Sequence, residues 1–128
     1  MSSLRRYEVL VPLVFNDGNP VPEALVSRTF IELREKFGAV SWETQVVRGG
    51  WEHEGTVYQD NLTRFVVDVP DLPEHREFFK RLKEELKQRF NQLDVWITSH
   101  PVDVICLLEP LTDRKGQEKR ALRPESRG

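Results

Sequence analysis

RFVVDVPDLPEHREFFKRLKEELKQRF, residues 64–90, contains a strand pattern, a turn and a helix pattern in one continuous run. Its first apolar residues alternate with other residues at the period of a strand: Phe65, Val67 and Val69. The proline-flanked turn Pro70-Asp71-Leu72-Pro73 ends that strand. Beyond the turn, large apolar residues recur every three or four positions: Phe79, Leu82, Leu86 and Phe90. The stretch therefore predicts a strand followed by an amphipathic helix that begins at Pro73.

The other positions of this helix are mostly charged, and residues of opposite sign stand four apart. These pairs are Glu77 with Arg81, Lys80 with Glu84, and Arg81 with Glu85. Opposite charges at this spacing stabilise a helix. We therefore interpret them as a solvated face and not as a ligand site.

The sequence before residue 64 predicts a strand, a helix and a second strand. Their ranges are Tyr7–Phe15, Pro22–Phe37 and Val40–Val46. Proline lacks a backbone N–H, so Pro12 indicates an edge-like or bulged stretch in the first strand. A hairpin turn is expected at Glu54-Gly55, with a bulge or bend at Gly49-Gly50.

Two stretches after the second helix also have the character of strands, Asp94–Thr98 and Val102–Leu108. The later one could lengthen the earlier one, add an extra C-terminal strand, or be exchanged with a neighbouring subunit, and periodicity does not distinguish these cases. We divide the chain into an N-terminal extension (1–6), one domain (7–111) and a basic, flexible tail (112–128).

The predicted order is strand, helix, strand, strand, helix, strand, which is the βαββαβ order of the ferredoxin-like α+β fold. In that fold an antiparallel four-stranded sheet has both helices on one face. The positions expected on its open face are too apolar for contact with water: Leu10, Val14, Val47, Val66 and Trp96. The sequence therefore predicts a homodimer that forms through this face.

Composition and charge exclude several classes of protein. The chain has 128 residues, of which 38% are hydrophobic and 31% charged, and a net charge of −2. Its single cysteine, Cys106, excludes an intramolecular disulfide and a multi-cysteine zinc site. No apolar run approaches the roughly 20 residues of a membrane-spanning helix. We expect a soluble, cytoplasmic protein without membrane association.

Three stretches resemble those of uncharacterised small bacterial ferredoxin-like domains. They are the hairpin Trp51-Glu52-His53-Glu54-Gly55-Thr56-Val57-Tyr58, the helix segment Phe79-Lys80-Arg81-Leu82-Lys83, and the turn Arg89-Phe90-Asn91-Gln92 after the second helix. The resemblance covers most of residues 7–105 and implies no particular activity. More distantly, the layout is similar to dimeric alpha-beta barrel proteins, which include cofactor-free monooxygenases and isomerases, and to small regulatory domains that bind ligands.

Histidines are the candidates for acid–base chemistry. His53 lies in the predicted hairpin, where Trp51 and Tyr58 form an aromatic lip and Asp60 is a candidate to orient the imidazole. His100 follows a strand, a common place for functional groups.

No metal site is expected in the hairpin, because Glu52 and Glu54 lie on the face of a strand opposite to His53. No sequence motif calls for a cofactor. Trp51 and Trp96 are candidates to contact a small-molecule ligand.

Nucleic-acid binding would depend on the tail. Six basic and three acidic residues give the tail a charge of +3 within an acidic chain. Its strongest candidates for phosphate contact are Arg114, Lys115, Lys119 and Arg120. The Arg/Lys-Gly-Phe motif of RNA-recognition modules does not occur in the sequence.

The sequence predicts a self-associating binding or regulatory module. One alternative is a cofactor-free small-molecule enzyme that uses His53 or His100 as acid or base. Another is a nucleic-acid-associated protein that uses the basic tail.

Overall fold

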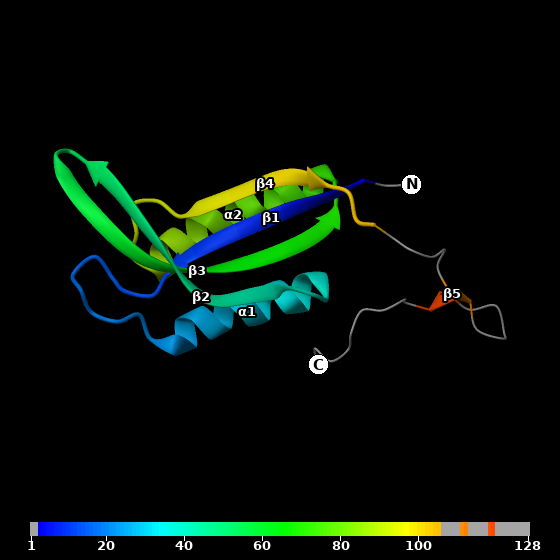
Figure 1. Cartoon of the computed structure of the whole chain (residues 1–128), viewed down its shortest axis with the longest axis horizontal. Coiled ribbons are helices and arrows are strands. Elements are labelled where there is room, and N and C mark those ends of the chain that lie inside the picture. Colours follow the sequence, from blue (N-terminus) through cyan, green and yellow to red (C-terminus); the bar gives the residue numbers. More distant parts are fainter. Residues whose placement is uncertain (1–2, 106–110, 113–117, 120–128) are drawn as a thin grey trace.

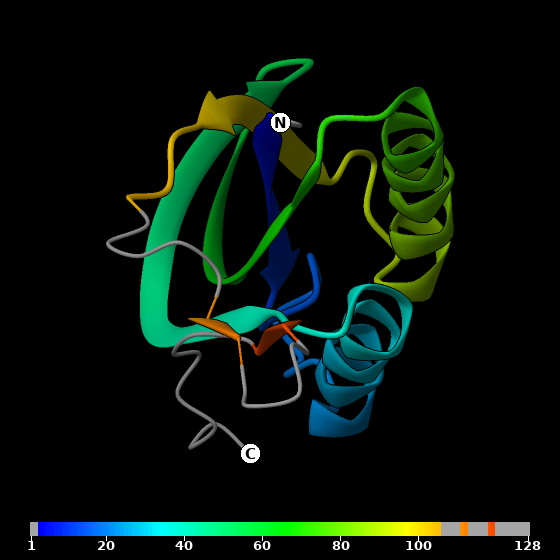
Figure 2. The same ribbon diagram turned by 90° about the vertical axis from the view of Figure 1, so that its right-hand side faces the viewer.

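The computed structural model describes residues 3–105, 111–112 and 118–119. Residues 4–102 form four strands and two helices in the order βαββαβ. They are β1 (Leu4–Pro12), α1 (Glu23–Phe37), β2 (Ser41–His53), β3 (Thr56–Pro70), α2 (Pro73–Arg89) and β4 (Trp96–Val102). The strands pair antiparallel in the order β2-β3-β1-β4, and both helices cover the same face of the sheet (Figures 1 and 2). The predicted α+β class is confirmed.

Both helices lie where the sequence predicts them. α1 follows Pro22 and ends at Gly38, whose φ of 84° is readily adopted only without a side chain and whose N–H bonds to the Arg34 carbonyl at 2.7 Å. α2 has Pro73 in its first turn, where the missing N–H costs no helical hydrogen bond.

The core lies between the sheet and the helices. The strands contribute alternate residues, which point toward the helices: Tyr7, Val9, Val11, Phe65, Val67 and Val69. α1 contributes Val26 and Leu33, and α2 contributes the apolar stripe that the sequence predicts: Phe79, Leu82 and Leu86, with Phe90 just beyond the helix. Burial of these stripes fixes which side of the sheet the helices cover.

The ends of two strands differ from the sequence prediction. β1 begins at Leu4 and pairs with both neighbours, so residues 4–6 belong to the sheet and not to an N-terminal extension. Its pairing with β4 stops at Leu10, which leaves Pro12 on a stretch with only one neighbouring strand. β4 continues through Pro101 to Val102, because an edge strand tolerates proline.

The hairpin of β2 and β3 is longer and more regular at its tip than predicted. The predicted turn at Glu54-Gly55 is present, and both residues have positive φ, 49° and 81°, as a two-residue turn of the primed type requires. β2 runs without interruption through Gly49-Gly50, so the predicted irregularity at the glycine pair is wrong. The register shifts earlier, between Glu43 and Val47.

Three alternatives were open for the segment after β4. β4 ends at Val102, residues 103–105 form no strand, and residues 106–108 lie outside the described residues. Two short strands follow, β5 (Leu111–Thr112) and β6 (Glu118–Lys119), and they pair only with each other. No helix in the described part of the chain is long and apolar enough to cross a membrane.

Candidate functional site

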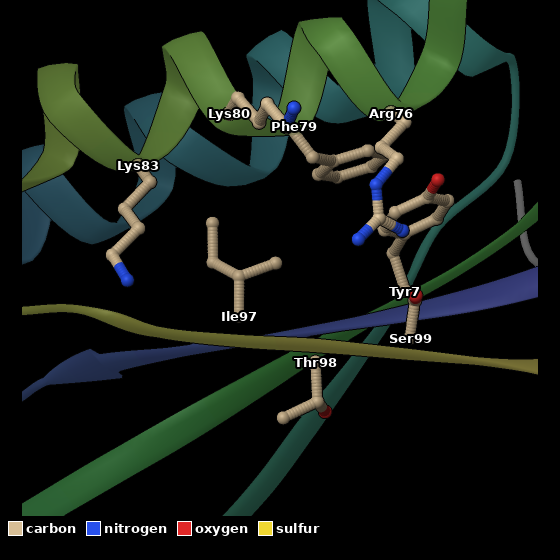
Figure 3. Close-up of a pocket in the computed structure, with 8 residues that line it drawn as sticks. All are labelled: Tyr7, Arg76, Phe79, Lys80, Lys83, Ile97, Thr98 and Ser99. Atoms are coloured by element: carbon tan, nitrogen blue, oxygen red, sulfur yellow. The ribbon is translucent and has the colours of Figure 1, made fainter. Parts of the chain in front are cut away.

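A cleft opens on the helix side of the sheet, between α2 and the edge strand β4 (Figure 3). Its volume is about 120 Å³. Strand residues on one side and helix residues on the other line it: Tyr7, Ile97, Thr98 and Ser99, with Arg76, Phe79, Lys80 and Lys83. None of these residues belongs to the site residues that the sequence predicts.

The floor of the cleft is apolar. The ring of Tyr7 stacks on that of Phe79, with centroids 4.0 Å apart and planes 9° from parallel. Ile97 points from β4 toward α2 beside this stack (Figure 3). Since both rings are almost fully buried, the floor is held rigidly by the core.

The helix wall of the cleft is cationic. Arg76, Lys80 and Lys83 have the spacing i, i+4, i+7 and therefore share one face of α2. Lys80 pairs with Glu77 at 3.2 Å and Lys83 with Asp94 at 3.0 Å. No carboxylate among the described residues pairs with Arg76. The Arg76 guanidinium points toward Tyr7 (Figure 3).

These ion pairs differ from the ones that the sequence predicts. Lys80 pairs with a residue three positions away and Lys83 with the loop after α2, whereas i, i+4 pairs were expected. The pairing with Asp94 joins α2 to the segment that leads into β4. Burial raises the pKa of Asp94, but the hydrogen bonds from Lys83 and the Val95 N–H outweigh it and leave the pKa lowered.

Arg5 fixes the strand wall of the cleft. Its Nη1 donates to the Ser99 Oγ at 3.0 Å, and its Nε donates to Asp71 at 3.1 Å. The Ser99 hydroxyl is thus held in one position by a cation that is itself paired.

A network of charges occupies the middle of the open face. Arg64 lies between two carboxylates, with Nε 3.1 Å from Glu8 Oε1 and Nη1 2.8 Å from Glu43 Oε1. Beside it, Arg6 donates twice to Asp68, at 2.8 and 2.9 Å. The hydrogen bonds that Arg6 donates to Asp68 raise the pKa of Arg6 more than burial lowers it. These pairs give the centre of the face a polar character that the sequence analysis did not anticipate.

The open face also carries apolar residues. Leu10 lies opposite Trp96 in the register of β1 and β4, and Trp96 is 63% exposed. Val47 lies opposite Leu62 in the hairpin. Of the five apolar positions predicted on this face, four belong to its strands, and Val14 lies after β1 in an isolated bridge with Pro20.

His100 is the histidine that the fold brings to a carboxylate. It lies on β4 on the open face, and its Nδ1 is 4.0 Å from Glu8 Oε2. Arg64 holds the other oxygen of that carboxylate. At this distance the two groups are neighbours without a hydrogen bond, and the His100 side chain is half exposed, at 51%.

The hairpin residues do not form one site. Asp60 pairs in register with Gly49, which lies four residues before His53 on β2. The backbones of Asp60 and His53 are therefore roughly 13 Å apart along the hairpin. His53 instead lies 3.8 Å from Glu54, with its ring 6.3 Å from that of Trp51. Tyr58 pairs in register with Trp51, and the side chains of Tyr58 and Asp60 lie outside the described part.

The remaining predicted residues lie apart from the cleft. Trp51 and Trp96 are on the hairpin and on the open face, respectively. In the tail, the backbone of Lys119 belongs to β6, while Arg114, Lys115 and Arg120 lie outside the described residues. Among the described residues, no group of His, Cys, Asp and Glu side chains could hold a metal ion.

The sequence does not predict the cleft, because its helix wall and its strand wall each have an ordinary sequence pattern. Arg76, Lys80 and Lys83 belong to a helix face that carries acidic residues as well, and such a face is typical of solvated surface. The available signal was the spacing of these three cations together with Phe79 between them. Only the packing of α2 against β4 brings them to Tyr7 and Ser99.

No family model and no curated protein matches this sequence. Among solved structures, the chain is similar to a phage SAM lyase in complex with S-methyl-5′-thioadenosine, with a TM-score of 0.61 at 16% identity, covering 81% of this chain and 92% of that one. At this identity the likeness shows a shared fold. A de novo designed protein with a ferredoxin fold also matches, with a TM-score of 0.28 at 15% identity, covering 87% of this chain and 94% of that one.

Proposed function

We propose that this chain is a self-associating binding module with a ferredoxin-like fold, in which two copies pack together through the open faces of their sheets. One observation carries the proposal: Trp96 is 63% exposed on a sheet face that neither of the two described helices covers (Figure 2). Leu10 lies opposite it, so the exposed indole is part of an apolar patch.

The charges of the open face support a second copy as the partner. The face carries both signs in alternation, with Arg64 between Glu8 and Glu43 and with Arg6 beside Asp68. A copy related by a twofold axis can place positive groups against negative ones, since the same patch meets itself.

The size of the face supports a weak dimer. β1 and β4 pair over seven residues, which span about 24 Å along the strands, and the four strands span about 19 Å across the sheet. The buried area, summed over both copies, is then roughly 900 Å². This area is at the lower end for specific association. We therefore expect dissociation in the micromolar range.

Light scattering after size exclusion tests the proposal over a concentration series. The wild-type mass should rise from monomer to dimer, and Trp96→Glu should shift this transition at least about tenfold toward higher concentration. Leu93→Glu is the matched control, because Leu93 is 55% exposed but lies in the loop before β4. A strict monomer throughout the micromolar range would contradict the proposal.

As a second candidate we propose a cofactor-free enzyme with His100, beside Glu8, as general base. The contact of 4.0 Å between His100 Nδ1 and the Glu8 carboxylate favours it. The phage enzyme that shares the fold is a SAM lyase, so S-adenosylmethionine is the first substrate to test.

The assay follows release of S-methyl-5′-thioadenosine by mass spectrometry. His100→Ala should abolish the release at an unchanged melting temperature, with His75→Ala, on the opposite side of the sheet, as the control. Full activity of both His100→Ala and His53→Ala would contradict an acid–base role for histidine, and absence of product would exclude this substrate.

A further inference from the structure

The cleft between α2 and β4 combines two surfaces that suit different parts of one ligand. Ile97 gives the cleft an apolar side, and the buried rings of Tyr7 and Phe79, which stack on each other, close its floor (Figure 3). Above the floor, Arg76 presents a guanidinium that no described carboxylate neutralises. A site of this composition favours a molecule with an apolar body and an anionic head.

We propose that this cleft binds a small carboxylate with a short apolar body, with the carboxylate on Arg76 and the apolar body beside Ile97. This inference concerns the helix side of the sheet, so it does not depend on the pairing of the open faces.

The choice of a carboxylate follows from the geometry of the cation. Guanidinium presents parallel N–H donors that match the two oxygens of a carboxylate. Lys83 lies on the same α2 wall as Arg76, but its ammonium pairs with Asp94 at 3.0 Å, so Arg76 is the cation that this wall offers to a ligand. The Ser99 hydroxyl, held by Arg5, can contact a polar atom at the strand wall.

The size of the ligand follows from the volume. A cavity of about 120 Å³ has room for about ten water-sized atoms. Phenylacetate has this size and the required apolar body, and its amide is an uncharged molecule of nearly the same shape. For so small a ligand we expect a Kd of about 1 mM.

A nuclear magnetic resonance titration of the full chain tests the proposal, with phenylacetate as the probe and sodium chloride at matched ionic strength. Amide shifts should occur at Tyr7, Phe79 and Ser99, and phenylacetamide should bind about tenfold more weakly or not at all. Arg76→Gln should weaken phenylacetate binding at least about tenfold. Arg81→Gln, an exposed position on the same helix, should leave it unchanged.

Four results would overturn the proposal. Two concern the ligand: phenylacetamide or inorganic phosphate binds as tightly as phenylacetate. The other two are that Arg76→Gln binds phenylacetate as tightly as the wild type does, and that no amide shift saturates at up to about 20 mM phenylacetate. Arg76 is exposed and makes no described side-chain pairing, so its replacement should leave the melting temperature unchanged. The dimer test on Trp96 reads a different face, so failure of one proposal is distinguishable from failure of the other.

Discussion

Arg89→Met tests whether one guanidinium joins the two helices. Arg89 ends α2, and its side chain is only 8% exposed. Its Nη1 lies 2.9 Å from the Thr29 Oγ1 and 2.9 Å from Glu32 Oε1, while its Nη2 donates to Glu32 Oε2 at 3.0 Å. Methionine keeps an apolar side chain of similar length, so the variant reports mainly on the lost guanidinium.

The expected loss can be worked out from the burial of both partners. Breaking a fully buried ion pair costs about 3–5 kcal/mol. Here the Glu32 side chain is 34% exposed and Arg28 stays 3.4 Å from it, so water and a second cation offset part of the loss. We therefore expect the free energy of unfolding to fall by about 2–3 kcal/mol. The melting temperature should fall by about 8–12 °C.

Urea unfolding followed by tryptophan fluorescence measures this change. Arg81→Met is the control, because Arg81 is exposed on the same helix and its replacement should cost under about 0.5 kcal/mol. In the double variant Glu32→Gln with Arg89→Met, the loss should be smaller than the sum of the single losses. A loss for Arg89→Met no larger than that for Arg81→Met would refute the reasoning.

Three further changes test other parts of the fold. The Thr63 hydroxyl accepts a hydrogen bond from the Trp42 indole N–H at 2.9 Å and donates one to the Glu43 carbonyl at 2.7 Å, and Thr63→Val removes both. Urea unfolding should therefore show that the free energy of unfolding falls by about 1–3 kcal/mol. An unchanged free energy of unfolding would mean that water replaces both bonds. The lowered pKa of Asp94 means that its contribution to stability is present above its ordinary pKa of 3.8 and disappears as the pH falls through the lower folded value. Asp94→Asn should therefore reduce the drop in melting temperature between about pH 6 and pH 2, and an unchanged drop would contradict this assignment. Deletion of residues 112–128 should abolish any salt-sensitive binding to nucleic acid, and binding that survives the deletion would reject the tail mechanism.

The proposed interface and the proposed ligand site use opposite sides of one sheet. Side chains alternate along a strand, so Ser99 faces the cleft while His100, the next residue, faces the charges of the open side. A shift of β4 by one residue would exchange these two positions. Ile97 of β4 packs against the core, and such a shift would move it to the open face, so the core fixes both surfaces.

The hairpin shows where local patterns were sufficient and where they were not. Glu54-Gly55 was identified from the residues alone, because few pairs adopt positive φ at both positions of a tight turn. The irregularity in β2 was assigned to Gly49-Gly50 and lies between Glu43 and Val47. Its place depends on how a curved strand fits β3, which no local pattern encodes.

The sequence by itself determined the helices, the order of the elements and the apolar stripe from Phe79 to Phe90, because these follow from periodicity, prolines and glycines within short stretches. Only the tertiary structure decided that Arg76 points toward Tyr7 in the cleft (Figure 3), and that His100 lies beside Glu8. The physical reason is that such neighbours are separated by many residues along the chain. Packing of α2 on the sheet and the register between β1 and β4 bring them together.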